Sequence, residues 1–417
     1  MSTRPPRFRG PDFSRLWVGD FVSNTGTAMV TFAVPVIGVT ELGLSAQQIS
    51  WVAAASLSAP LFFSLSAGAL ADRLRRSFLL HVCNIARFVI FALLCVLFLV
   101  GSLGWVSLAV GLFAVGVLNL LYESSMAAAV PSVVSKGDLV KANSWIEGGL
   151  SVSETGGPVF SGFILNTFGA LAILVLNAVS YLFSSLMLLG LPLDRRGSKD
   201  KPERFSIKGH LSEVWLGFRL IWGQVPQRVA LFAATLYNFF DSWLFAIFSV
   251  FALTVLGLSP FTFGLVFAVA TVTGIVGSGV AVKLTDRYGF GTLLVTSFSM
   301  IAMAGIALAF SVLLEGLSAA VLVAAVFAIF EFCIVVNMII GRTMRQTLFP
   351  EEHISKVAGT ARFLSWGVDP LGALVGGACA AALGLETSVV IACCGFSLAA
   401  LVCLCSRELR SFRPVLA

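Results

Sequence analysis

The sequence predicts an all-α polytopic membrane protein with twelve transmembrane helices in two pseudo-symmetric six-helix bundles. Three observations predict this architecture: a composition too apolar for a water-facing surface, a series of apolar runs of spanning length, and basic residues confined to one set of loops. Of the 417 residues, 58% are hydrophobic and only 12% are charged, whereas about 25% of residues are charged in an average soluble protein. Most of the surface is therefore expected to face lipid.

The apolar runs give the number of spans. A spanning helix needs about 20 predominantly apolar residues. Twelve runs meet this requirement, at residues 16–40, 47–70, 77–100, 105–129, 141–167, 170–191, 229–256, 260–283, 290–313, 317–341, 356–383 and 386–405. The breaks between them carry turn residues or charge, notably at Gly43, Gly101 to Gly104, Gly169, Gly257 to Pro260, Gly316 and Gly384 to Glu386. An even number of spans places both termini on the same side of the membrane.

The basic residues predict which side that is. Of the 27 Lys and Arg residues, 26 fall in the two terminal tails and in alternate loops or their flanks, and the opposite loops hold none. Only Arg87 lies well inside a span. Because Lys and Arg are enriched in cytoplasmic loops, the basic side is expected to be cytoplasmic. This asymmetry accounts for the net charge of +6 without a nucleic-acid partner.

The longest polar stretch divides the chain into two halves. We expect a cytoplasmic N-terminal tail, an N-terminal bundle, a cytoplasmic linker, a C-terminal bundle and a cytoplasmic C-terminal tail, at residues 1–15, 16–191, 192–227, 228–406 and 407–417 respectively. Within the linker, residues 210–222 have the spacing of an amphipathic helix, which we expect to lie along the inner membrane surface.

Matching polar residues indicate that the two halves are repeats. The pairs, offset by 214 or 215 residues, are Asp72-Arg73 with Asp286-Arg287, Asn24 with Asn238, Glu123 with Asn337, and Glu154 with Asp369. Each pair alone is weak, but together they support two six-helix repeats in the same orientation, which is a known transporter plan.

The loop after the second span carries a family resemblance. Residues 68–76, Gly-Ala-Leu-Ala-Asp-Arg-Leu-Arg-Arg, resemble the hallmark motif of the major facilitator superfamily, with Leu74 where the family usually has Gly. The resemblance implies a cytoplasmic latch in which Gly68 permits close helix packing, Asp72 accepts hydrogen bonds at a helix N-terminus, and Arg76 pairs with Glu123. Arg73 belongs to the same motif, and the second copy keeps Asp286 and Arg287. The alternative is a plain positive anchor.

The fifth span and three other segments resemble exporters of this superfamily. Residues 156–162 contain Gly156, Gly157, Pro158 and Gly162, as in the Gly-Pro motif of the antiporters, although Ser161 replaces one glycine. An ordinary packing kink is the alternative, since Pro and Gly bend and thin any membrane helix. Residues 13–19, 130–143 and 362–372 are similar to the bacterial drug and siderophore exporters, a branch that includes macrolide-efflux and enterobactin-export proteins.

Charges inside the spans are the candidate coupling groups. An ionisable side chain near the helix centre costs about 2.5–3.5 kcal/mol on insertion scales, so each needs a reason. Glu154, Asp241, Glu331 and Asp369 lie near the middle of their spans, and Asp20 lies nearer a cytoplasmic end. A carboxyl group in a partly desolvated cavity can exchange a proton near working pH. We therefore expect Glu154 or Asp369 to couple transport to protons, with Glu331 and Asp241 next. For any one of them, a fixed hydrogen bond or ion pair is the open alternative.

These features predict a monomeric secondary transporter, with the lipid bilayer, protons and a small-molecule substrate as its partners. The resemblance to the exporters implies that it lies in the bacterial inner membrane. The expected activity is proton-coupled export of an amphipathic drug or siderophore by alternating access, and no enzyme activity, cofactor or metal is expected. Residues that could line the substrate cavity are Asn24, Arg87, Asn238, Phe239, Phe330 and Asn337. A facilitator-type importer that works by symport, and a non-transporting receptor or scaffold, are the alternatives.

Overall fold

The computed structural model describes residues 10–135, 138–193 and 207–412, with side chains omitted at residues 64–73, 128, 140, 207–214, 282, 351–352 and 355. The regular secondary structure of this part of the chain is entirely helical. The chain divides into two compact units, unit 1 (residues 1–43 and 55–205) and unit 2 (residues 44–54 and 206–417). The division after Phe205 falls within the polar stretch that separates the predicted bundles.

Unit 1 contains most of the first five helices. They are α1 (Pro11–Thr40), α2 (Ala46–Arg73), α3 (Arg76–Leu99), α4 (Trp105–Val133) and α5 (Leu139–Leu188). In this unit α1 packs along α5, while α3 packs against both α4 and α5. A buried apolar cluster joins these helices, with Leu16 from α1, Leu80 from α3 and Val130 from α4 among its members.

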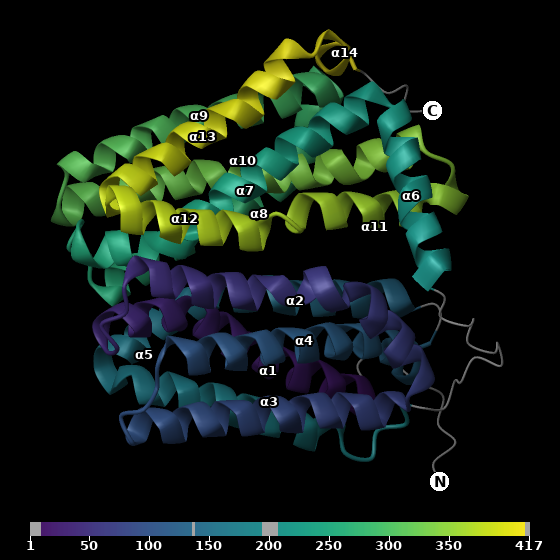
Figure 1. Ribbon diagram of the computed structural model, residues 1–417. Helices are drawn as coiled ribbons and strands as arrows, with labels where there is room; N and C mark the ends of the chain where they lie inside the picture. Colours follow the sequence, from purple (N-terminus) through teal and green to yellow (C-terminus); the bar gives the residue numbers. More distant parts are fainter. Residues whose placement is uncertain (1–9, 136–137, 194–206, 413–417) are drawn as a thin grey trace. The chain divides into compact units, whose positions relative to one another are not determined.

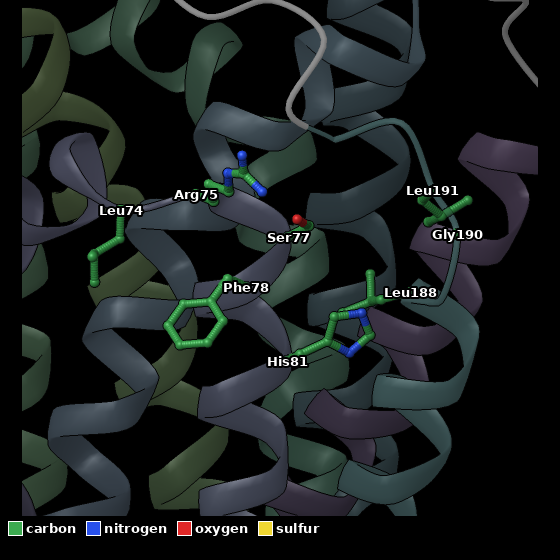
Figure 2. A pocket seen from close by; sticks show the side chains of 8 residues that line it. All are labelled: Leu74, Arg75, Ser77, Phe78, His81, Leu188, Gly190 and Leu191. Carbon is green, nitrogen blue, oxygen red and sulfur yellow. The ribbon is translucent and has the colours of Figure 1, made fainter.

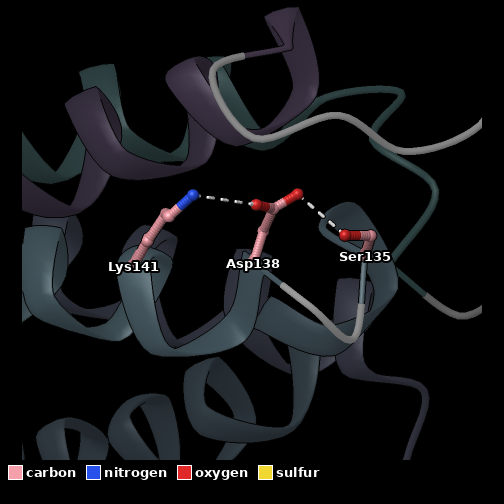
Figure 3. Close-up of polar contacts among 3 residues, drawn as sticks. All are labelled: Ser135, Asp138 and Lys141. Carbon is pink, nitrogen blue, oxygen red and sulfur yellow. Dashed lines mark hydrogen bonds and ion pairs between the residues drawn. The ribbon is translucent and has the colours of Figure 1, made fainter.

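A small polar contact group lies at the start of α5 (Figure 3). The Ser135 hydroxyl donates a hydrogen bond of 2.7 Å to one carboxylate oxygen of Asp138. The Lys141 ammonium lies 3.8 Å from the other carboxylate oxygen. Because the Lys141 side chain is 66% exposed, this ion pair adds little to stability.

Unit 2 contains the remaining helices and residues 44–54 of the chain, which include the start of α2. The helices are α6 (Ile207–Gly223), α7 (Val225–Thr254), α8 (Pro260–Tyr288), α9 (Phe290–Ala309), the 3₁₀ turn η2 (Phe310–Leu313), α10 (Gly316–Leu348), α11 (Glu351–Trp366), α12 (Asp369–Leu383), α13 (Leu385–Cys405) and α14 (Arg407–Arg410). Figure 1 shows the α-helices among these with the same labels. Here α8 packs against α10, and α7 packs against both α12 and α13.

The helix breaks confirm the turn positions expected from glycine. Gly43, Gly101, Gly257, Gly316 and Gly384 all have positive φ. Ten helices in the described residues are long and apolar enough to cross a membrane. One of them, α5, is a merged pair of helices, and the 28-residue α2 is not among the ten. Counting the two parts of α5 separately and adding α2 gives the twelve expected spans.

Within α5 a single residue separates the fifth and sixth predicted spans. Gly169 has φ 77° and ψ 179°, which are far from helical values. A side chain would be strained in this conformation, whereas glycine adopts it readily. The two helices therefore reverse direction without a loop.

The predicted span at residues 356–383 differs from the structure because it is interrupted. α11 ends at Trp366 and α12 begins at Asp369, with Gly367 and Val368 between them (Figure 1). Pro370 lacks the backbone N–H that would bond the carbonyl of Trp366 in a continuous helix, so the helical hydrogen bonding is broken here. This break places Asp369 in the first turn of a new helix.

The predicted amphipathic helix in the linker is present as α6. Its buried side, which includes Ile221, packs against Val357 of α11. On its other side the Phe218 ring stacks on Trp215 and Trp222, with ring centroids 5.6 and 5.1 Å away. Trp215 and Trp222 are 67% and 56% exposed. An exposed aromatic face suits a membrane interface. The position of α6 on the inner membrane surface stays a prediction.

Candidate functional site

A buried guanidinium group is the centre of the polar cluster of unit 1. Arg87, on α3, is 2% exposed. Its Nη2 donates a hydrogen bond of 2.9 Å to the carbonyl oxygen of Leu118 on α4. Its guanidinium carbon lies 4.4 Å from the ring centroid of Tyr122 and 5.3 Å from that of Tyr181. Two aromatic faces can hold a desolvated cation in this way.

A buried carboxylate lies in the electrostatic field of this cation. Asp20, on α1, is 5% exposed and interacts electrostatically with Arg87. Its Oδ2 accepts a hydrogen bond of 3.1 Å from Asn24. The Tyr122 hydroxyl approaches Asp20 but completes no hydrogen bond of normal geometry in the described structure. Arg87 and Asn24, both predicted cavity residues, thus belong to one cluster, and opposite charges offset part of each other's burial cost.

The Gly-Pro segment of α5 packs closely against α1. A Cβ atom on Gly157 would lie 2.6 Å from the Cβ of Ala28. The Ser161 hydroxyl donates a hydrogen bond of 2.9 Å to the carbonyl oxygen of Met29. Gly156 instead faces the ring of Phe160 on its own helix, and the motif residues Pro158 and Gly162 are half-buried and buried, respectively.

Glu154 lies three residues before this contact, on the same helix. Its side chain is exposed, and the charge that acts on it is that of Glu147, seven residues earlier on α5. Glu154 therefore stands apart from the Arg87 cluster, although both belong to unit 1.

Unit 2 brings two predicted carboxylates together. Asp241, on α7, accepts a hydrogen bond of 3.0 Å from the Tyr237 hydroxyl. Asp369, at the start of α12, interacts electrostatically with Asp241, and the Ser242 hydroxyl contacts it. The Oδ1 atom of Asp369 is buried and has no hydrogen-bond partner among the described atoms. We call Tyr237, Asp241, Ser242 and Asp369 the carboxylate pair site.

Aromatic rings surround the carboxylate pair site. Tyr237 is 7% exposed, and its ring lies 5.5 Å from Phe396 and 6.5 Å from Phe298. The ring of Phe239 lies 5.2 Å from Phe240 in an edge contact. The site therefore combines two acidic groups with an apolar lining.

Glu331 comes from α10 and packs closely on α8. A Cβ atom on Gly274 would lie 2.9 Å from the Cγ of Glu331. Glu331 also acts electrostatically on Tyr237. The ring of Phe330, the neighbouring predicted cavity residue, lies 5.0 Å from Phe396. Glu331 is thus near the carboxylate pair site and acts on it through its charge.

The two asparagines of unit 2 make fixed contacts between helices. Asn238 donates a hydrogen bond of 2.8 Å to the carbonyl oxygen of Ser365, at the end of α11. Ser297 on α9 donates a hydrogen bond to the Oδ1 of Asn337 on α10. The Nδ2 of Asn337 has no partner among the described atoms. Asn238 therefore holds α7 against the helix end that precedes the break at Gly367.

The predicted latch lies partly outside the described side chains. The side chains of Gly68, Asp72 and Arg73 are not described, although the backbone of α2 is helical up to Arg73. Arg76 is half-buried at the start of α3, and Glu123 is exposed on α4. The pairing of Arg76 with Glu123 stays a prediction.

The second copy of the latch motif lies at the end of α8. Asp286 and Arg287 are both exposed. The guanidinium carbon of Arg287 lies 5.3 Å from the ring centroid of its neighbour Tyr288. The described contact of Arg287 is therefore local to the end of this helix.

Several residues of the two polar sites are not evident from the sequence alone. Tyr122, Tyr181, Tyr237 and Ser242 complete the two polar sites, but tyrosine and serine in apolar runs are ordinary packing residues. Asp20 had a usable signal, since a lone buried cation such as Arg87 needs a carboxylate at similar depth. In the described residues, no group of three or more His, Cys, Asp or Glu side chains could hold a metal ion.

Comparison with known proteins identifies the architecture. The sequence matches the family model described as Major Facilitator Superfamily over residues 16–368. No curated protein matches the sequence.

Solved structures resemble the fold along nearly the whole chain. The nucleoside transporter NupG is 12% identical with a TM-score of 0.73, and the match covers 96% of this chain and 100% of that chain. A bacterial homologue of the iron transporter ferroportin in an inward-facing state is 15% identical with a TM-score of 0.73, covering 96% and 99%. A bacterial homologue of the human lysosomal transporter Spinster is 14% identical with a TM-score of 0.65, covering 94% and 95%. At these identities the likeness concerns the fold alone.

Proposed function

Since this chain belongs to the major facilitator superfamily and is a secondary transporter rather than an enzyme, we propose that it exports a small amphipathic molecule in exchange for protons. The proposed site of action is the inner cell membrane, with both termini in the cytoplasm, as the distribution of basic residues predicts. The proposed substrate class is a drug or siderophore, after the resemblance to exporters in the segments around residues 13–19 and 362–372.

The observation that carries this proposal is the carboxylate pair site. Asp241 and Asp369 come from different helices and act on each other within an apolar, aromatic surrounding. Two like charges so placed repel, and the repulsion is removed when the pair binds a proton or a cationic group of a substrate. Because either ligand can relieve the repulsion, proton and substrate compete for the pair, and such competition is what exchange requires.

The surroundings of the pair suit a substrate with an apolar body. The ring of Phe240 stacks on Trp243 with centroids 5.9 Å apart, and Phe239 packs edge-on against the same ring at 6.1 Å. Ligand sites of this kind are lined mainly by apolar and aromatic side chains with few polar groups. A lipophilic cation fits both the rings and the two carboxylates.

The break before Asp369 gives the pair a means to respond to occupancy. Discontinuous helices bind substrate or coupling ions at the interruption in many transporters. Here the interruption at Gly367 lies between Ser365, which accepts a hydrogen bond from Asn238, and Asp369. Protonation of Asp369 therefore acts at the joint between α11 and α12.

Transport in proteoliposomes tests the proposal. Vesicles holding the purified protein receive ethidium, a lipophilic cation, and a pH gradient that is acidic inside. The wild type is expected to accumulate ethidium, whereas Asp241→Asn and Asp369→Asn lose gradient-driven accumulation yet retain exchange of ethidium down its own gradient. Glu154→Gln is measured alongside, because Glu154 and Asp369 are the two coupling residues that the sequence predicts first.

Glu386→Gln is the matched control, because Glu386 is an exposed carboxylate in the first turn of α13. Full gradient-driven accumulation in both aspartate variants would remove the carboxylate pair from the coupling mechanism. A symporter would not accumulate ethidium under this gradient, and a receptor or scaffold would show no flux under any gradient.

A further inference from the structure

A cavity of ≈ 620 Å³ lies in unit 1, and no residue of either polar site lines it (Figure 2). One wall comes from the segment between α2 and α3 and from the first turns of α3, and the other comes from the end of α5 and the residues that follow it. The lining residues are Leu74, Arg75, Ser77, Phe78, His81, Leu188, Gly190 and Leu191. In Figure 2, Ser77 and His81 of α3 lie on the side of that helix toward Leu188 and Gly190.

The polar part of the lining is cationic and rich in hydrogen-bonding groups. Arg75 is exposed and has no ion-pair partner among the described residues. His81 uses its Nδ1 in a hydrogen bond of 2.9 Å with Ser185, which leaves Nε2 for a ligand. None of the eight lining residues is acidic. A guanidinium group, a hydroxyl group and an imidazole, from Arg75, Ser77 and His81, therefore surround one cavity, and such groups bind small anions.

The wall formed after α5 is itself held in place. Arg15 Nη2 donates a hydrogen bond of 2.8 Å to the carbonyl oxygen of Leu189. Gly190 has φ 73°, so the chain turns sharply where it borders the cavity. The wall that follows α5 is therefore anchored to α1 through Arg15.

Large apolar side chains adjoin the cationic part. Phe78 is 57% exposed and Leu74 is 39% exposed. A free phosphate would leave these apolar surfaces in contact with water. An acyl chain would cover them, and burial contributes about 25 cal/mol of favourable free energy per Å² of apolar area removed from water. On the orientation predicted from the basic residues, this end of unit 1 faces the cytoplasmic leaflet, where anionic lipids attract basic groups.

We propose that this cavity binds the phosphate group of an anionic phospholipid. Arg75 supplies the opposite charge, Ser77 and His81 supply hydrogen bonds, and Leu74 and Phe78 support the first part of an acyl chain. The site is independent of the carboxylate pair and of the transport activity proposed above. It would hold the start of α3 and the end of α5 to one lipid molecule.

Calorimetric titration of the purified full-length protein in detergent tests this assignment. The probes are dioctanoyl phosphatidylglycerol, dioctanoyl phosphatidylcholine and inorganic phosphate. Phosphatidylglycerol is expected to bind most tightly, and Arg75→Gln is expected to weaken its binding about tenfold, which corresponds to about 1.4 kcal/mol. Phe78→Ala is expected to weaken binding of the lipid severalfold without changing binding of phosphate.

Lys141→Gln is the matched control, since Lys141 is an exposed cation of unit 1 that does not line the cavity. Equal binding of phosphatidylglycerol to the wild type and to Arg75→Gln would overturn the proposal. The proposal would also be overturned if phosphate binds as tightly as the lipid and Phe78→Ala does not change lipid binding, because that result identifies a site for a free anion.

Discussion

Replacing Gly157 with alanine tests whether close approach of α1 and α5 depends on the missing side chain. The added Cβ would lie 2.6 Å from the Cβ of Ala28 and 3.1 Å from the backbone nitrogen of Met29. Ordinary carbon contacts are about 3.5–4.0 Å, so the helices must separate by about 1 Å. Overpacking of this kind costs about 1–3 kcal/mol, and the loss of glycine flexibility in the unfolded chain returns about 0.4–1 kcal/mol. We expect a net destabilisation of about 1–2 kcal/mol.

The measurement is thermal unfolding in detergent, followed with a thiol-reactive fluorophore. The protein carries its own reporters, because Cys83, Cys95, Cys333, Cys393 and Cys403 are free and buried. For a unit of about 150–250 residues, such as unit 1, each kcal/mol shifts the melting temperature by about 2–4 °C. Gly157→Ala should therefore lower the apparent melting temperature of unit 1 by about 2–8 °C.

A second glycine on the same helix provides the control. An added Cβ on Gly148 would have no neighbouring atom within 4 Å, so Gly148→Ala should melt at the wild-type temperature or slightly above it. If Gly157→Ala melts no lower than Gly148→Ala, then the steric reasoning for this interface is wrong.

Two further outcomes are expected from the same unfolding assay. Arg87→Leu should destabilise the protein by about 3–5 kcal/mol, because it leaves the Asp20 carboxylate buried without its cation. Adding Asp20→Asn to this variant should recover part of the lost stability. If the destabilisations of the two single variants simply add, Arg87 and Asp20 are not coupled. Gly217→Ala should lower the melting temperature, because the new Cβ would lie 2.8 Å from the carbonyl oxygen of Lys356. Gly223→Ala should leave the melting temperature unchanged, because no atom lies within 4 Å of the added Cβ. Equal melting temperatures of the two variants would contradict the close α6–α11 contact.

The ends of the helices are the part of the fold that local sequence predicts best. Gly169 and Gly384 mark reversals because they adopt backbone conformations that other residues avoid. The break at Gly367 was harder to predict. Pro370 is the local cause, but prolines also lie inside continuous helices here, as Pro35 does in α1 and Pro158 does in α5. Whether a proline ends a membrane helix depends on its neighbours in space.

The direction in which each side chain points is the part that the sequence does not reveal. When a helix is apolar on all sides, the sequence shows no difference between an apolar and a polar face, so it does not indicate which face is buried. Glu154 and Asp369 occupy matching positions in the two halves, yet Glu154 is exposed on α5 while Asp369 meets Asp241 across a helix interface. The spacing along the chain gave no reason to join Asp369 with Asp241 rather than with Glu331.

The single-residue joint at Gly169 limits how the two parts of α5 can move. Consecutive Cα atoms are about 3.8 Å apart, so the residues on either side of the joint cannot separate by more than about 7 Å. The two parts can pivot about this point, but they cannot slide past each other. The first part carries Glu154 and Gly157, and the second carries Tyr181, whose ring covers the Arg87 guanidinium. A tilt of the first part relative to the second would therefore reach the ring beside the buried cation as rotation about one fixed pivot.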